Sequence, residues 1–158
     1  MTNLPLEDGH EAEPAAGDVA STNGANTLNP AGWAPPRGYS NGVSVHGRLV
    51  VLAGQIGWDP IHCAFASDDF ADQTRQTLTN IVKLLNEAGA SPAHLVRLTW
   101  YITSRDDYVA SRARIGLAWK EIIGKHYPPM SVVVVSGLLE ERARVEIEAT
   151  AVIPDQVG

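Results

Sequence analysis

The chain has 158 residues, 44% of them hydrophobic, so it is long enough for one domain with a substantial core. Its formal net charge of -6 is unevenly spread, because residues 1–30 contain five acidic side chains and no Lys or Arg. The rest of the chain carries 13 acidic and 12 basic side chains. A domain with so nearly balanced a charge lacks the positive surface of a protein that binds phosphate backbones, so we expect no nucleic-acid partner.

Residues 1–30 are rich in Ala, Gly, Asn, Thr and acids and show no periodicity, which is typical of a disordered segment. We expect a disordered acidic tail there and a single folded domain over residues 31–158. The N-terminus lacks the basic and apolar regions of a secretion signal, and no stretch has the length of a membrane span. We therefore expect a cytoplasmic protein without a membrane partner.

Two strands are predicted at residues 43–46 and 48–53, and Gly47 between them favours a hairpin. Gly54 and Gly57 follow. These glycines either let a ligand or another backbone approach closely or simply form a connecting turn. Asp68 or Asp69 can cap the next predicted helix, which Gly89 ends. Its apolar side recurs at helical spacing, at Phe70, Thr74, Leu78, Ile81, Leu85 and Ala88.

Residues 95–102 are β-branched and aromatic, which predicts a third strand, and Asp106 or Asp107 can cap a second helix that runs to about Gly124. Residues 132–135 are four valines without a polar face, which favours a strand covered on both sides. Residues 144–152 alternate instead, so Glu146 and Glu148 lie opposite the core. A carboxylate there is either a solvated side chain or an acid/base group in a cleft. The apolar side of this last strand comprises Val145, Ile147, Ala149 and Ala151.

The element order β-β-α-β-α-β-β predicts an α+β fold in which two helices lie together on one face of an antiparallel or mixed sheet. Two helices can cover only one face of that sheet. Because the valine strand favours cover on both faces, we expect copies of the chain to associate.

Four fragments in this order make the chain resemble the YjgF/RidA family, whose members include enamine and imine deaminases. They are residues 38–43, residues 53–56, the helix from about Gln73 to Ala88-Gly89, and residues 145–152. The resemblance covers residues 37–153. It implies a chorismate-mutase-like α+β fold that assembles as a homotrimer with inward-facing sheets. It also implies three ligand clefts between neighbouring subunits.

The resemblance assigns roles to individual residues. Glu146 matches the catalytic Glu that directs water onto the C=N carbon of a 2-imino acid, which releases ammonia and leaves a 2-oxo acid. Tyr39 matches the Tyr that lines the cleft, and the peptide groups around Gly54 and Val132 match the backbone contacts. The full set of expected substrate-binding residues is Tyr39, Ala53, Gly54, Arg112, Met130, Ser131 and Val132.

Met130 departs from the family pattern, because deaminating members carry an Arg there that grips the substrate carboxylate. Loss of that contact would weaken binding of a small imino acid roughly tenfold to a hundredfold. Arg112, where relatives often have Asn, either supplies a displaced anion contact or is an ordinary exposed helical Arg. Ala53 and Val132 replace a hydroxyl residue and a frequent Cys. Together with Trp58 or Trp100, these residues suggest a larger or uncharged substrate, or simply pack a subunit interface.

Two functions therefore remain open. The first is hydrolytic deamination of an enamine or imine, 2-aminoacrylate-like or larger and including one without a free carboxylate, with Glu146 directing water. The second is a non-catalytic homotrimer that binds a small metabolite. His62 and Cys63 are adjacent but lack further ligands at a zinc spacing, so we expect neither a metal nor a cofactor.

Overall fold

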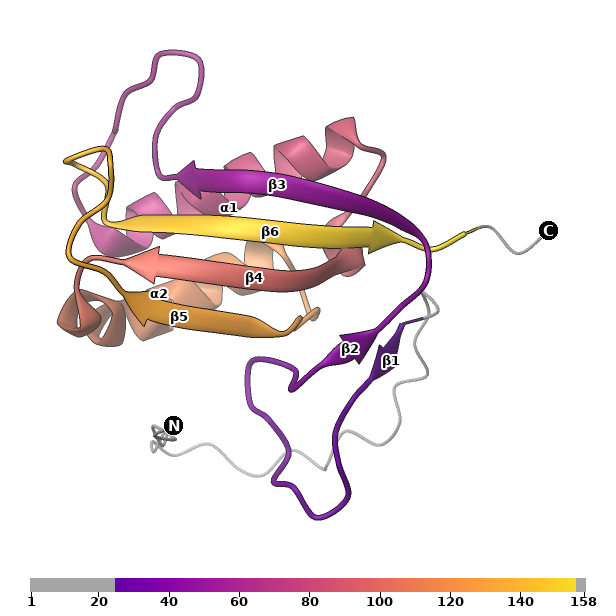
Figure 1. Ribbon diagram of the computed structural model, residues 1–158. Coiled ribbons are helices and arrows are strands. Elements are labelled where there is room, and N and C mark those ends of the chain that lie inside the picture. The colour runs from indigo at the N-terminus through magenta and orange to yellow at the C-terminus, as the bar shows by residue number, and fades with distance from the viewer. Residues whose placement is uncertain (1–24, 156–158) are drawn as a thin grey trace.

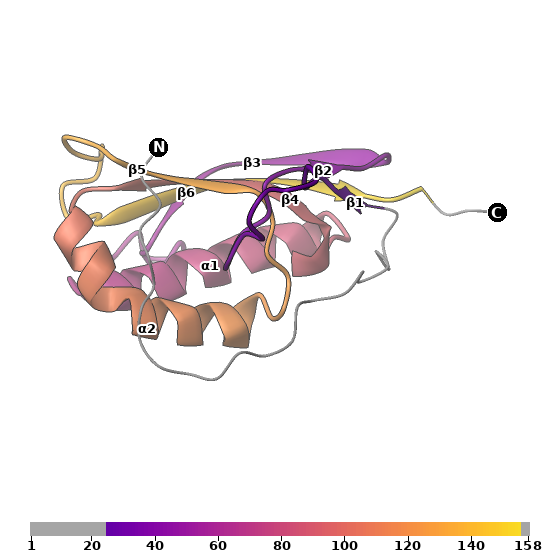
Figure 2. The same ribbon diagram turned by 90° about the horizontal axis from the view of Figure 1, so that it is seen from below.

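The computed structural model describes residues 25–155, which form a four-stranded sheet with two helices packed on one face (Figures 1 and 2). The strand order is β3-β6-β4-β5; β6 is antiparallel to both β3 and β4, whereas β5 is parallel to β4. This arrangement confirms the predicted α+β fold with a mixed sheet. The elements of this layer pair are β3 (Arg48–Ile56), α1 (Phe70–Glu87), the 3-10 helix η1 (Pro92–His94), β4 (Leu95–Ile102), α2 (Arg105–Ile122), β5 (Met130–Val134) and β6 (Val145–Ile153).

The central strand β6 fixes which side chains face the helices. Val145, Ile147, Ala149 and Ala151 are at most 2% exposed and pack beneath α1, so the predicted alternation is confirmed. Because side chains of a strand alternate between faces, Glu146 and Glu148 lie on the face that the helices leave open.

Both predicted helices are present, with one correction at a cap. Asp69 caps α1 as predicted, since its Oδ1 accepts the backbone N–H of Asp72 at 3.0 Å. The cap of α2 is Ser104, not Asp106 or Asp107: Ser104 Oγ accepts the N–H of Asp107 at 3.1 Å. The two acids lie in the first turn, where their negative charges interact favourably with the positive end of the helix dipole. No helix among the described residues is long and apolar enough to cross a membrane.

The expected hairpin around Gly47 is wrong. The first of its strands, β2 (Val43–Ser44), pairs with the short β1 (Asn26–Thr27) in a separate two-stranded sheet. Gly47 has another use: its φ is +150°, and a Cβ there would come within 2.8 Å of the Ile153 carbonyl carbon. The glycine therefore lets the chain enter β3 beside the end of β6, a contact that local sequence does not reveal.

Strand β1 also lies inside the segment expected to be a disordered tail. Residues 1–24 of that segment are outside the described residues. Residues 25–30 are described, and Asn26 and Thr27 pair with Ser44 and Val43. Residues 25–30 thus contribute one strand of the two-stranded sheet, and the domain boundary at residue 30 stays a prediction.

The open face of the sheet is apolar at both edges. Leu49 and Val51 of β3 are 61% and 69% exposed, and Val133 of β5 is 41% exposed. Strand β5 is an edge strand, so the chain by itself does not provide the cover that its valines were expected to have on both faces.

Candidate functional site

A cavity of about 750 Å³ lies where α2, β5 and the segment around Tyr39 meet. Its lining is mostly aromatic and aliphatic, and among the described residues the only ionisable side chains that line it besides tyrosines are two arginines. The aromatic members of the lining are Tyr39, Trp100, Tyr108, Trp119 and Tyr127.

The aromatic side chains of the cavity pack against one another. Trp119 stacks on Tyr127 with ring centroids 6.2 Å apart and planes 10° from parallel, and it also stacks on Trp100 at 6.4 Å. Tyr108 meets Trp100 edge-on at 6.5 Å. Such mutual contacts hold the rings in defined positions, so the wall is preformed rather than assembled around a ligand.

Two hydrogen bonds hold the segment around Tyr39 against the approach to β5. Ser40 Oγ donates to the Tyr127 carbonyl at 2.6 Å, and the Ser40 N–H donates to the Pro128 carbonyl at 3.4 Å. Tyr39 and Met130 thereby line the same cavity.

The charge of the cavity is positive. Arg37 and Arg112 line it, no carboxylate does, and neither arginine forms an ion pair within residues 25–155. Arg112 is half-buried, and its Nε donates weakly to the Val109 carbonyl on its own helix at 3.4 Å. Burial raises the pKa of the Tyr108 hydroxyl, so that wall residue stays neutral. The cavity therefore suits a ligand with negative charge.

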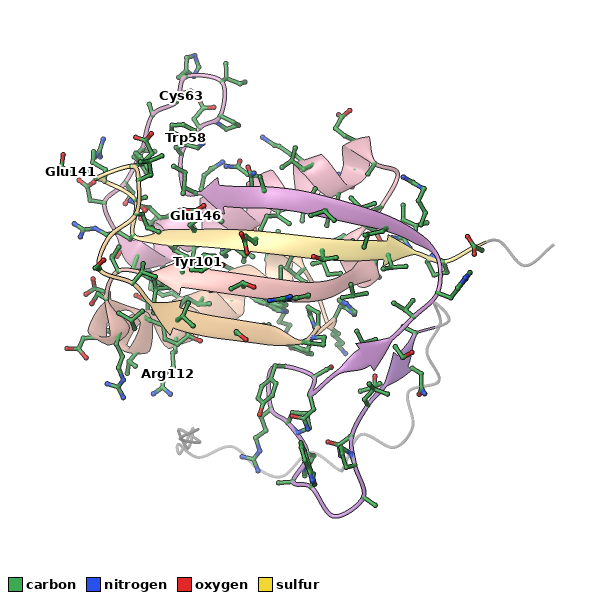
Figure 3. The ribbon with its side chains drawn as sticks, viewed as in Figure 1. Trp58, Cys63, Tyr101, Arg112, Glu141 and Glu146 are labelled. Atoms are coloured by element: carbon green, nitrogen blue, oxygen red, sulfur yellow. The ribbon has the colours of Figure 1, made fainter. Side chains whose placement is uncertain are left out.

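Glu146 occupies a different place, on the open face of the sheet beside Gly54. A Cβ at Gly54 would collide with the Glu146 Oε1 and lie 2.7 Å from its Cδ, so the glycine makes room for the carboxylate. Tyr101 is the β4 partner of Glu146, and Figure 3 shows the two on the same face of the sheet. The Tyr101 hydroxyl donates to Glu148 Oε2 at 3.0 Å, and this bond raises the Tyr101 pKa.

The expected site residues thus fall into two groups. Tyr39, Arg112, Met130 and Val132 line the cavity. Gly54 and Glu146 meet on the open face, where Ala53 is an exposed neighbour and Ser131 is in register with Thr99. Figure 3 shows Arg112 beyond the β5 edge, away from Glu146. Within residues 25–155 of one chain, neither Gly54 nor Glu146 lines the cavity.

The sequence interpretation missed several cavity residues. Arg37, Tyr108, Trp119 and Tyr127 were not expected there, and of the two tryptophans considered only Trp100 lines the cavity. Trp58 instead packs near Phe65, with ring centroids 6.2 Å apart. The signal for α2 was present: Tyr108, Arg112, Ile115 and Trp119 recur at spacings of three and four, which places them on one side of a helix.

The loop after β3 holds the adjacent pair that resembled metal ligands. His62 Nδ1 lies 2.6 Å from Asp59 Oδ2, which lowers the Asp59 pKa, while Cys63 is exposed. Among the described residues, no three His, Cys, Asp or Glu side chains are grouped so that they could hold a metal ion.

Comparisons with known proteins agree with this architecture. The family described as endoribonuclease L-PSP matches residues 31–153. A RutC family protein from Pyrococcus horikoshii is 34% identical over 113 residues, covering 72% of this chain and 85% of the relative. A 2-iminobutanoate/2-iminopropanoate deaminase from Bos taurus is 30% identical over 114 residues, with 72% of this chain and 79% of the relative covered.

A solved structure shares the fold. It is YyfB from Yersinia pestis, described as a protein of unknown function of the conserved Rid family, with a TM-score of 0.71 and 31% identity. The match covers 82% of this chain and 99% of the other. From its matched residues, its relatives and its fold, the chain belongs to the endoribonuclease L-PSP family, which is the YjgF/RidA family.

Proposed function

We propose that the protein is a homotrimeric hydrolase that converts an imine to the carbonyl compound and ammonia. Each site would combine the cavity of one subunit with Gly54 and Glu146 of its neighbour. The observation that carries this proposal is the place of Glu146: its carboxylate lies over Gly54 on the open face, apart from the cavity residues of its own chain. Neither group alone has both a binding pocket and an acid/base residue.

The open face supports association of this kind. Leu49, Val51 and Val133 expose large apolar side chains there. Large apolar exposure on a sheet face is typical of a surface that a partner covers. Three copies that turn these faces inward would bury the side chains and bring Glu146 of one subunit toward the β5 edge of the next.

The proposed imine hydrolysis needs one acid/base residue, Glu146. Water adds to the C=N carbon as Glu146 takes one of its protons and passes it to the nitrogen, so a neutral tetrahedral carbinolamine forms. Glu146 then takes the proton of the carbinolamine hydroxyl and delivers it to the nitrogen as the C–N bond breaks, so ammonia leaves and the carbonyl forms. The carboxylate is regenerated, and the overall reaction consumes one water.

Relatives support the reaction class, since proteins from Bos taurus and Capra hircus that are 30% identical to this chain are named 2-iminobutanoate/2-iminopropanoate deaminases. Met130 favours a second candidate, a trimer that binds a metabolite without turnover, because a thioether cannot anchor a carboxylate. Ribonuclease activity, which the family description names, is not proposed, since residues 31–158 carry nearly balanced charge.

The test follows imines generated in situ by an amino-acid oxidase, with release of ammonia and 2-oxo acid measured against the uncatalysed rate. We expect Glu146→Gln to lower kcat about a hundredfold or more, which is the usual contribution of a general base. Glu148→Gln is the matched control: it removes a carboxylate from the same face but keeps an oxygen that accepts the Tyr101 hydroxyl. Equal loss in both variants, or none in Glu146→Gln, would remove Glu146 from the mechanism. Imine binding without turnover in wild type would favour the second candidate.

A further inference from the structure

The cavity is large and aromatic for the smallest imino acids. A volume of about 750 Å³ falls within the range of pockets that enclose ligands much larger than a three-carbon acid. Tyr39, Trp100, Tyr108, Trp119 and Tyr127 contribute to its lining. Aromatic walls that already stack on one another favour a further ring, which gains offset or edge-on contacts without reorganising the wall.

The arginine side chains that line the cavity can donate hydrogen bonds to an acceptor group of a ligand. Arg112 presents its guanidinium from a rigid helix, half-buried and without a carboxylate partner in the described part of the chain. Arg37 also lines the cavity, but it lies on an exposed loop. A guanidinium that is partly withdrawn from water and held on a helix is the better anchor for a carboxylate, because less side-chain freedom is lost on binding.

Trp100 carries an unpaired donor next to the cavity. The residue is only 2% exposed and contributes to the cavity wall, yet its indole N–H has no hydrogen-bond partner within residues 25–155. Buried donors are rarely left unpaired in native proteins.

We propose that the substrate is a 2-imino acid with an aromatic side chain, whose ring enters this cavity and whose carboxylate is held by Arg112. This inference rests on the proposed imine hydrolysis and specifies its substrate. Arg112 replaces the anion contact that Met130 cannot make, while the thioether of Met130 adds apolar surface beside the ring. The specificity of the cleft thus moves from short to aryl-bearing imino acids.

Binding of the corresponding 2-oxo acid products tests the proposal without turnover. Isothermal titration of the full-length protein should show phenylpyruvate binding at least about tenfold tighter than pyruvate, which lacks the ring. It should also bind at least about tenfold tighter than phenylacetone, which lacks the carboxylate. Equal affinity for pyruvate and phenylpyruvate would overturn the proposed aromatic specificity.

Variants separate the anchor from general charge effects. Arg112→Gln should weaken phenylpyruvate about tenfold to a hundredfold and leave phenylacetone unchanged. Lys120→Gln is the matched control, because it removes one positive charge from the same helix at an exposed position outside the cavity. Unchanged phenylpyruvate affinity in Arg112→Gln, or an equal loss in Lys120→Gln, would contradict the assignment. A tenfold loss in Arg37→Gln alone would transfer the anchor to Arg37 and refute the role of Arg112.

Failure of the substrate assignment can be distinguished from failure of the proposed imine hydrolysis. Glu146→Gln should bind phenylpyruvate like wild type although it has lost turnover. Arg112-dependent phenylpyruvate binding with no turnover of any imine would contradict the reaction but support the ligand class. Faster turnover of 2-iminopropanoate than of the phenylalanine-derived imine would support the reaction but overturn the substrate assigned here.

Discussion

Gly54 shows how a single residue positions the proposed catalytic group. Its missing Cβ leaves the space that the Glu146 carboxylate fills, and an added methyl would meet Oε1, Cδ and Cγ of that side chain. If the added methyl forces the Glu146 carboxylate to turn away, the carboxylate is no longer aligned with the attacking water of the proposed reaction. Displacement of a catalytic group by about 1 Å lowers the rate on the order of a hundredfold.

We therefore expect Gly54→Ala to lower kcat for imine hydrolysis about tenfold to a hundredfold while the melting temperature changes by only a few degrees. Steady-state kinetics and thermal unfolding measure the two effects. Gly137→Ala is a suitable control, because Gly137 is outside the cavity lining and a Cβ there meets nothing within 4 Å. Wild-type turnover in Gly54→Ala would show that the close contact with Glu146 has no catalytic importance.

Residue positions were only partly predictable from sequence. The alternation of β6 correctly placed Glu146 opposite the core, and Gly54 within β3 and Gly57 just after it both lie where a Cβ would meet close neighbours, one of the two interpretations that the sequence left open. The separation of Glu146 from Tyr39 and Met130 was not predictable, because it depends on which sheet face each strand residue occupies after the sheet has assembled. The role of each residue in substrate binding or catalysis stays a prediction.

Asp69 links two elements, the N-terminus of α1 and the outer side of α2. Its carboxylate accepts a hydrogen bond from Arg114 Nη1 at 2.9 Å and the N–H of Asp72 at 3.0 Å. The Arg114 bond, followed by the Asp72 N–H, lowers the Asp69 pKa below its ordinary value of 3.8. The folded state therefore binds this proton less tightly than the unfolded chain does.

It follows that the contribution of Asp69 to stability is present above its ordinary pKa and is lost as the pH falls through the lowered value. Asp69→Asn should reduce the free energy of unfolding at pH 7 by at most about 1 kcal/mol, since the pair is exposed and the amide still caps the helix. Denaturant titrations at pH 7 and near pH 2, at one protein concentration, should show that the difference in free energy of unfolding between wild type and Asp69→Asn shrinks at low pH. A constant difference would contradict the linkage.

Elements with strong local signals were predicted well. Strand β4 begins and ends at the predicted residues, and α1 begins after the predicted cap. The β2 pairing was predicted wrongly because it depends on β1, a two-residue strand without a hydrophobic pattern. The α2 cap was misassigned because Ser104 and the two following acids are all acceptable capping residues, and only geometry distinguishes them.

The proposed site would form only when copies of the whole molecule assemble. Val51 is 69% exposed in the single chain on the open sheet face, whereas Leu117 is 66% exposed on α2. Because neither side chain supports the core of one chain, a charge at either position should leave the fold intact.

We expect Val51→Asp to shift the protein from trimer to monomer in sedimentation experiments and to abolish imine turnover. Leu117→Asp, a matched change on the helical side, should keep both the assembly and the activity. A monomeric wild type, or a fully active monomeric Val51→Asp variant, would be incompatible with a site shared between subunits.

Complementation between two inactive variants is the most direct test of that shared site. Glu146→Gln disables the open face, and Gly116→Trp fills the cavity from a position where a Cβ has free space. If each site takes Glu146 from one subunit and the cavity from another, random co-assembly of equal amounts restores about one quarter of the wild-type turnover. If both groups acted within one subunit, every site would carry one defect, and the mixture would stay as inactive as either variant alone.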